Sequence, residues 1–233
     1  MSASPAGPVP VAAAPAADAV VRLGLPLRVA PAALRPLWPV APLNGPARPV
    51  VHAGSVDVFL EALDIAAPGE IMVIDNGGRL DEACIGDLTA LEVRGAGLAA
   101  IVLWGCHRDT AELRAIGLPV FSLGALPAGP ASARERGPQT FARALIGEAE
   151  VIPGDVVVAD DDGVLFVSAV AWPAVADLAA AITATERHQA GLAASGTNLR
   201  EQYAFADYLA RRAADHGYTF RAHLRERGAA IEE

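Results

Sequence analysis

The sequence contains no lysine, and all 18 of its positively charged side chains are arginines. A Schiff-base aldolase, a pyridoxal-phosphate enzyme and a P-loop nucleotide hydrolase each need a lysine amine at the reacting centre, so these three classes are excluded. Arginine stays protonated and cannot act as an amine nucleophile, but its planar guanidinium binds carboxylates and enolates through paired hydrogen bonds. The positive side chains are therefore expected to supply fixed charge and anion recognition.

Cysteine is also scarce, with only Cys84 and Cys106 in the chain. Together with five histidines they form no spacing typical of a zinc site, and the neighbouring side chains of Cys106 and His107 should point apart. Both thiols are therefore expected to be packing residues. The low cysteine content, the lack of a basic segment before an apolar core and the lack of an apolar run of about 18 residues favour a cytoplasmic protein without a membrane span.

The charge balance is acidic, with a net charge of -9 at pH 7. Nucleic-acid binding depends largely on Lys and Arg side chains that neutralise phosphates, so DNA and RNA are poor candidate partners. Hydrophobic residues make up 53% of the 233 positions, which is enough for a sizeable core. These values indicate one α/β domain with an additional terminal segment.

Hydrophobic periodicity and turn residues predict the order of the elements. Residues 1–16 are rich in Ala and Pro and are expected to be disordered, and a short helix follows near 16–24. The expected strands are 49–54, 71–75, 98–104 and 119–123, with two more in 154–167; helices start near 86 and at 110, and a turn lies at 76–78. Thr110 is the expected N-cap of the second of these helices. This is a βαβαβ order to which the last two strands add antiparallel pairing.

Charged residues follow two of the expected strands. Asp87 stands at the start of one helix and Arg108-Asp109 follows the next strand, so all three are expected at the sheet edge where open α/β sheets bind ligands. The backbone N–H groups of Leu88 and Thr89 are expected to face the same cleft and to suit a substrate carboxylate. The two aspartates offer hard oxygen ligands for Mg²⁺ or Mn²⁺. The alternative is an N-cap aspartate beside a surface ion pair, which spacing alone leaves open.

The interval from Asp87 to Arg108-Asp109 resembles the D-x20-R-D signature of a known family. This family joins the regulator of ribonuclease activity A to the 4-hydroxy-4-methyl-2-oxoglutarate/4-carboxy-4-hydroxy-2-oxoadipate aldolases. The segments "VIDNGGRLDEACIGDL", "GLAAIVLWGCHRD", "GLPVFSLGALP" and "PGDVVVADDDGVLFV" are similar to successive blocks of the family, in the same order. With the weaker "ADAVVRLG" and "GPARPV", the resemblance covers roughly residues 17–190. It implies a layered α/β/β/α swivelling-type domain with a mixed sheet, and it leaves residues 191–233 as a C-terminal helical extension.

The resemblance also implies the roles of the site residues. Asp109 would bind the divalent metal, Mg²⁺ or Mn²⁺, and Asp87 would support it and take part in catalysis. Arg108 would hold the pyruvyl carboxylate and the enolate oxygen, while Gly86 and Leu88 would border the substrate with backbone groups. The family's glutamate from a neighbouring subunit matches no motif here; Glu186 and Glu201 are candidates, and neither is assigned.

The implied activity is that of a metal-dependent class II pyruvate aldolase that acts on a small 2-oxo acid. It would cleave a 4-hydroxy-2-oxo acid of the 4-hydroxy-4-methyl-2-oxoglutarate type to release pyruvate, and it would also decarboxylate oxaloacetate. The expected assembly is a homotrimer or homohexamer. Two residues depart from the family pattern near the signature, Trp104 before Gly105 and His107 before the arginine, and both put the substrate's identity in question more than the chemistry.

Alternative functions remain open at this point. The family includes non-catalytic regulators of an RNA-degrading endonuclease, which act by protein contact. A menaquinone-type methyltransferase is a third possibility, but the chain shows no glycine-rich nucleotide-binding loop of the expected kind. The acids Asp160 to Asp162 suit a calcium site less well than an exposed hairpin turn. In the extension, Leu199, Tyr203, Phe205 or Ala206, and Leu209 follow helical spacing and predict a packing face that carries no chemistry.

Overall fold

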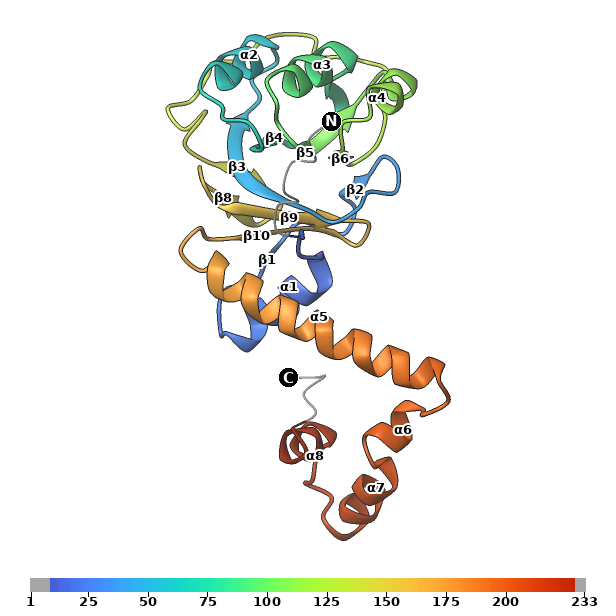
Figure 1. The fold of residues 1–233 in the computed structure, drawn as a ribbon. Coiled ribbons are helices and arrows are strands. Elements are labelled where there is room, and N and C mark those ends of the chain that lie inside the picture. Colours follow the sequence, from blue (N-terminus) through green and yellow to red (C-terminus); the bar gives the residue numbers. More distant parts are fainter. Residues whose placement is uncertain (1–8, 229–233) are drawn as a thin grey trace, which may run out of the picture.

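The computed structural model describes residues 9–228, and Figure 1 shows them as a four-layered α/β/β/α body with a helical arm. Eight strands form one mixed sheet in the order β1-β10-β9-β3-β4-β5-β6-β2. Their bounds are β1 Arg28–Val29, β2 Arg35–Pro36, β3 Leu43–Val51, β4 Ile71–Ile85, β5 Ala100–His107, β6 Val120–Ser122, β9 Val156–Asp160 and β10 Gly163–Val167. Strands β3 to β6 are parallel and the remaining pairs are antiparallel, which confirms the mixed sheet.

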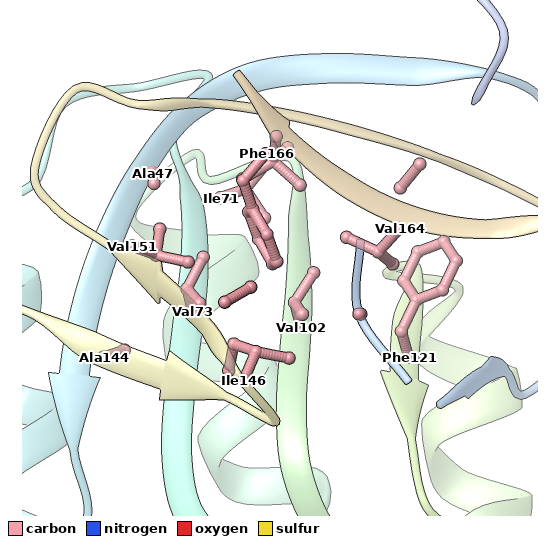
Figure 2. Close-up of a cluster of buried hydrophobic side chains, with 14 of the residues drawn as sticks. Ala47, Ile71, Val73, Val102, Phe121, Ala144, Ile146, Val151, Val164 and Phe166 are labelled. Carbon is pink, nitrogen blue, oxygen red and sulfur yellow. The ribbon is translucent and has the colours of Figure 1, made fainter. Parts of the chain in front are cut away.

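The two halves of the sheet face each other across a central apolar core. Alternate residues of β4 point to opposite sides, so Ile71 and Val73 enter this core while Met72 and Ile74 face the outer helices. Figure 2 shows Ile71, Val73 and Val102 packed toward Val164 and Phe166 of β10. Both faces of β4 and β5 are therefore buried, which explains their nearly continuous apolar sequence.

Helices cover the two outer faces of the sheet (Figure 1). Helices α2 (Asp57–Asp64), α3 (Asp87–Gly95) and α4 (Thr110–Ile116) pack on the parallel half, where Phe59 and Leu113 are fully or almost fully buried. Helices α1 (Ala13–Arg22) and α5 (Trp172–Ala194) pack on β9 and β10, α1 through Val20 and α5 through Val175 and Ala179. Each layer thus buries an apolar face against the next, as a layered domain requires.

Several elements differ from the sequence-based expectation. Helix α2 and the hairpin of β7 (Ala144–Ile146) and β8 (Ala149–Val151) were not expected, and β3 begins at Leu43 instead of at 49. Residues 76–78 do not reverse the chain: β4 continues through them, and its register with β5 jumps from Asp75/Trp104 to Arg79/Gly105. Gly77 and Gly78 both have φ of 66°, so the segment is a bulge that glycine makes possible.

The N-terminal helix begins at Ala13, inside the segment expected to be disordered. The Ala13 N–H donates to Asp160 Oδ2 at 2.7 Å, and Ala16 and Ala19 are fully buried against the sheet. Small alanine side chains let the helix approach β10 closely, so an Ala-rich composition was wrongly interpreted as disorder for residues 13–16. Residues 1–8, which carry the rest of that expectation, lie outside the described residues.

The C-terminal arm consists of the distal part of α5 followed by α6 (Leu199–Gln202), α7 (Phe205–Ala214) and α8 (Phe220–Glu226). Helix α5 continues through residue 190, where the extension was expected to start. The breaks near Gly196 and Gly217 are present, but Ala204, with φ of 46°, also separates α6 from α7. The expected packing face is therefore only partly right. Leu199 and Leu209 are about half exposed, while Tyr203 and Tyr208 are buried.

No helix among residues 9–228 is long and apolar enough to cross a membrane.

Candidate active site

The candidate site lies where β4 and β5 end side by side. Ile85 of β4 pairs with His107 of β5 in parallel register, so the residues that follow each strand emerge at the same sheet edge. The residues singled out from the sequence, Gly86, Asp87, Leu88, Arg108 and Asp109, all line one cavity of about 220 Å³. The parallel register, with a helix starting after each strand, thus brings together residues that are more than twenty positions apart.

Asp109 adopts a left-handed backbone conformation with φ of 58° and ψ of 43°. Aspartate visits this region more readily than most residues, and such local strain is common at functional sites. Its carbonyl accepts the Leu113 N–H at 2.9 Å, so Asp109 occupies the N-cap position of α4 and Thr110 is the first helical residue. The expectation that Thr110 is the N-cap is therefore wrong. The Asp109 side chain is left to face Gly86, and its Oδ2 lies 3.4 Å from the Asp87 N–H.

Asp87 begins α3 and uses one carboxylate oxygen locally. Its Oδ1 accepts the Leu88 N–H at 2.7 Å. This N–H was expected to be available to a substrate carboxylate, but it is already bonded. An aspartate in the first turn readily forms this bond because its short side chain reaches the adjacent unpaired amide. Leu88 nevertheless borders the cavity, and its side chain is 72% exposed. The structure thus places Asp87 at the site but assigns one of its oxygens to the helix start.

Arg108 is held loosely beside Asp109. Its Nε lies 3.5 Å from Asp109 Oδ2, and the two side chains are 50% and 36% exposed. A pair this long and this exposed contributes about 0–1 kcal/mol to stability. The Arg108 backbone N–H, in contrast, donates to the Ile85 carbonyl at 3.0 Å, so the main chain is fixed while the guanidinium stays available for an anion.

Gly86 has no room for a side chain. A Cβ atom at this position would overlap Asp109 Oδ2 and would lie 3.3 Å from Arg108 Cγ. The absence of a Cβ therefore lets the carboxylate of one strand end approach the backbone of the other. This close approach gives a physical reason for glycine before Asp87.

His52, which was not among the predicted site residues, also lines the cavity. It directly follows β3, the strand beside β4, and its side chain is almost completely buried. Its Nδ1 lies 2.9 Å from Asn76 Oδ1, and burial lowers the pKa of the imidazole below its usual value. The signal that could have identified it was a polar residue directly after the apolar Val50 and Val51, inside the expected strand 49–54, at the point where β3 ends.

Trp104 and His107, the two departures from the family pattern, are not among the residues of the described range 9–228 that line this cavity. Trp104 lies under the glycine bulge, where a Cβ on Gly78 would come within 2.8 Å of the indole nitrogen. His107 is buried with both ring nitrogens occupied, Nδ1 by Ser122 Oγ at 2.8 Å and Nε2 by Thr110 Oγ1 at 3.0 Å. It therefore links β6 to the start of α4, which supports the Arg108-Asp109 turn from behind.

The carboxylates that line the cavity, among residues 9–228, are those of Asp87 and Asp109. Residues 9–228 contain no group of three or more His, Cys, Asp or Glu side chains that could hold an ion. Mg²⁺ usually keeps several water ligands and is bound through one or two carboxylates, so a pair of aspartates is compatible with it. Glu186, on α5, lines a separate apolar cavity in the arm, and neither it nor Glu201 of α6 lines the candidate site of the same chain.

Other groups considered from the sequence have structural roles. Cys84 and Cys106 are free and buried, and burial raises the pKa of both thiols, which agrees with packing. The acids of the β9–β10 hairpin bind backbone amides: Asp160 accepts the Asp162 N–H and Asp161 accepts the Val40 N–H. These bonds stabilise a turn, as expected, and occupy oxygens that calcium would need.

The family assignment follows from comparison with known proteins. The family model RraA-like: Aldolase/RraA matches residues 13–166. This chain belongs to that family. A relative from Burkholderia multivorans, provisionally named a 4-hydroxy-4-methyl-2-oxoglutarate aldolase, is 34% identical over 139 residues, which cover 60% of this chain and 84% of the relative. A protein of the same provisional name from Deinococcus radiodurans is 38% identical over 112 residues, covering 47% and 67% of the two chains.

Solved structures share the fold of this chain. An uncharacterized protein from Pseudomonas syringae pv. tomato superposes with a TM-score of 0.72 at 24% identity, covering 82% of this chain and 92% of its own. Streptomyces coelicolor RraAS2, described as an unusual member of the RNase ES inhibitor RraA protein family, gives 0.65 at 25% identity, covering 76% and 88%. The layered domain expected from the resemblance is thereby confirmed.

Proposed function

We propose that this chain is a divalent-metal-dependent lyase that cleaves a 4-hydroxy-2-oxo acid to release pyruvate and that it also decarboxylates oxaloacetate. The observation that carries the proposal is the single cavity in which Asp87, Arg108 and Asp109 meet. Its volume of about 220 Å³ lies below the ~300–1,000 Å³ of pockets for drug-sized ligands, which suits a small acid. The aldolase names of the two relatives support the same class of reaction.

The side chains of the cavity divide the chemistry between them. Asp109, with Asp87 beside it, would hold Mg²⁺ or Mn²⁺, which supplies Lewis acidity toward the 2-oxo group when bound. Arg108, which is only loosely paired, binds the substrate carboxylate and places a fixed positive charge where the enolate oxygen develops. The backbone of Gly86 and Leu88 borders the same space and limits how the acid lies against these groups.

One site serves both reactions because both leave the same enolate of pyruvate. In the retro-aldol reaction the bond between C3 and C4 breaks and a carbonyl compound departs, whereas oxaloacetate loses CO₂. Arg108 stabilises the negative charge that remains in either case. The reactions differ in one requirement, since only the retro-aldol step needs a base to remove the proton of the C4 hydroxyl.

Metal removal provides the first test. Purified protein is treated with EDTA, and pyruvate release from oxaloacetate and from 4-hydroxy-4-methyl-2-oxoglutarate is followed before and after Mg²⁺ or Mn²⁺ is restored. We expect both activities to disappear with the chelator and to return with either ion. Folded, metal-supplemented protein that releases no pyruvate from either acid would contradict the proposal and favour the non-catalytic role of the RNase ES inhibitor type described for the Streptomyces relative.

Gly86→Ala tests the close approach at the strand ends. The added Cβ overlaps Asp109 Oδ2, so either the carboxylate or the backbone must move away from the cavity. Displacing one group of a preorganised site lowers kcat by about 10²-fold. The measurement is pyruvate release with circular dichroism as the control for folding, and Gly95→Ala, in the same helix and with open space around its Cβ position, is the matched variant. Equal rates in the two variants would contradict the assigned role of Gly86.

We also propose that the protein assembles as a trimer or a dimer of trimers, with the site near a subunit boundary. Helix α3 exposes Leu88, which lines the cavity, by 72% and Leu91, three residues further along the helix, by 48%, and exposed apolar groups of this kind mark contact surfaces when they cluster. Light scattering at micromolar concentration should give three or six times the chain mass of 23.9 kDa. A monomeric mass would overturn this part of the proposal.

A further inference from the structure

The candidate site contains one imidazole that the assigned roles leave unused. His52 enters the cavity from the end of β3, on the side opposite to the end of β5, because β4 lies between these two strands. Its ring stacks on Phe59 of α2, with centroids 5.3 Å apart and planes inclined by 13°. The ring is therefore held in one orientation by packing, while one edge remains part of the cavity wall.

The hydrogen bond to Asn76 determines which ring nitrogen carries the proton. Asn76 Oδ1 lies 2.9 Å from His52 Nδ1 and 3.4 Å from Arg134 Nη2, and a guanidinium only donates, so this atom of Asn76 acts as the acceptor. His52 Nδ1 must then carry the hydrogen. In the neutral ring the other nitrogen, Nε2, has a free lone pair and is available to accept a proton.

The charges around His52 favour this neutral form. Burial lowers the pKa of His52, and the positive charges of Arg134 and Arg79 act in the same direction, whereas the Asn76 hydrogen bond and the Glu82 carboxylate oppose them. Glu82 itself is buried and engaged by both arginines, which weakens its pull on the imidazole. The net effect of these groups lowers the pKa of His52 and favours the neutral ring.

The other side chains near the cavity are poorly suited to accept a proton. Arg108 stays protonated at any accessible pH, and the raised pKa of the Cys84 thiol keeps it neutral. His107 is farther back, with both ring nitrogens already bonded. Asp87 and Asp109 are the carboxylates that fit the metal. His52 is therefore the neutral base of the cavity among residues 9–228.

We infer that His52 Nε2 is the general base that removes the proton from the C4 hydroxyl of a 4-hydroxy-2-oxo acid. The inference rests on the proposed function. The O–H electron pair forms the carbonyl of the departing product, the bond between C3 and C4 breaks, and its electrons form the enolate of pyruvate. The proton on His52 is then transferred to C3 of this enolate, or it is lost to solvent while C3 takes a proton from solvent, so that pyruvate and a second carbonyl compound are released and the base is restored.

This role separates the two proposed reactions. Oxaloacetate has no C4 hydroxyl to deprotonate, so its decarboxylation does not call on His52. Removing the imidazole should therefore change the ratio of the two activities. A purely structural role would lower both rates together.

The experiment compares His52→Gln with the parent and with His188→Gln, which removes an exposed histidine of α5 as the matched control. Glutamine preserves a hydrogen-bonding group toward Asn76 but is not a base. We expect kcat for cleavage of 4-hydroxy-4-methyl-2-oxoglutarate to fall by about 10²–10⁴-fold, the usual contribution of general base catalysis, and decarboxylation of oxaloacetate to fall far less. Equal losses in both reactions, or no loss in either, would overturn the inference.

A second variant tests the proton transfer itself. Asn76→Asp places a carboxylate against Nδ1 and raises the pKa of His52. The base must be neutral to act, so the cleavage rate falls as pH drops through this pKa, and the acid limb of its pH profile should move to higher pH by about one unit. An unmoved acid limb would contradict the role of His52.

The protonation state is measured without turnover. In ¹⁵N-histidine-labelled protein, NMR should show His52 at pH 7 as a neutral ring with hydrogen on Nδ1, with the signals assigned by their loss in His52→Gln. A ring protonated on Nε2 at pH 7 would overturn the inference even if the protein cleaved no acid. Absent activity toward both acids in the parent would instead refute the proposed function, so the two failures are distinguishable.

Discussion

Asp109→Asn is expected to lose pyruvate release by about 10³-fold while the protein remains folded, which is the upper end of the range for removing one electrostatic group from a site. Asparagine keeps the size of aspartate and one oxygen, but it lacks the negative charge that makes a carboxylate a good ligand for a hard divalent cation. It also tolerates the left-handed backbone conformation seen at this position. The loss should therefore arise from weaker metal binding and not from an altered turn.

The control for this prediction is an aspartate outside the site. Asp177→Asn changes an aspartate of α5, far from β5 in the layered fold, and should leave pyruvate release and circular dichroism like those of the parent. If folded Asp109→Asn retained parental activity, the metal-site assignment would be wrong. A non-catalytic regulatory function would then be favoured over the enzymatic one.

Arg108→Lys is expected to fail in a different way. Lysine keeps the positive charge but loses the planar arrangement of donors that binds a carboxylate at two points. Because Arg108 is only weakly paired with Asp109, the substitution should leave the metal ligands nearly undisturbed. We expect a higher KM for the 2-oxo acid and a loss of about 10²–10³-fold in kcat/KM, which corresponds to about 3–4 kcal/mol of transition-state stabilisation.

The pair of variants separates a functional site from a surface ion pair. If Arg108 and Asp109 merely bridged at the surface, either substitution would change stability by about 0–1 kcal/mol and would leave turnover intact. Steady-state kinetics of pyruvate release by Arg108→Lys, at saturating Mg²⁺, provides the comparison. Unchanged kcat/KM in this variant would contradict the role of the guanidinium in substrate binding.

The strands buried on both faces were the most predictable part of the fold. Residues 98–104, most of which belong to β5, form a continuous apolar segment, and the prediction of this strand needed no long-range information. β3 was harder, because the stretch up to about residue 49 was interpreted as punctuated by prolines and the strand was expected to begin only at Pro49. The N–H groups of Ala47 and Val51 point away from β4, toward Asp155 and Thr140, so the nitrogen of Pro49 faces the same side and no bond of the parallel ladder is lost. That compensation depends on the tertiary structure and is invisible in the sequence.

The candidate site was predictable to the extent that a motif defined it. The signature located Gly86, Asp87, Arg108 and Asp109, and the parallel register of β4 and β5 explains why their spacing brings them together. It gave no information on the left-handed conformation of Asp109 or on the Leu88 amide that Asp87 occupies. These features depend on how two helix starts meet.

His52 was missed for a related reason. It follows a third strand, and its hydrogen-bond partner Asn76 lies opposite it where the parallel register of Val51 and Asp75 ends, immediately before β4 bulges at Gly77 and Gly78. A second register shift, between Arg79 and Ala83, spans Glu82. Both irregularities build the buried polar network behind the cavity. A bulge of this kind re-aims side chains near functional sites and is difficult to infer from alternation alone.

The most direct test of the account is Mn²⁺ binding measured by electron paramagnetic resonance, in which free Mn²⁺ is quantified as each folded protein is titrated. We expect the parent to bind one Mn²⁺ per chain and Arg108→Lys to bind it with nearly parental affinity. Asp109→Asn should bind it at least about tenfold more weakly, because a charged oxygen ligand is lost. Equal Mn²⁺ affinity in the parent and in Asp109→Asn would contradict the claim that the strand ends of β4 and β5 form a metal site.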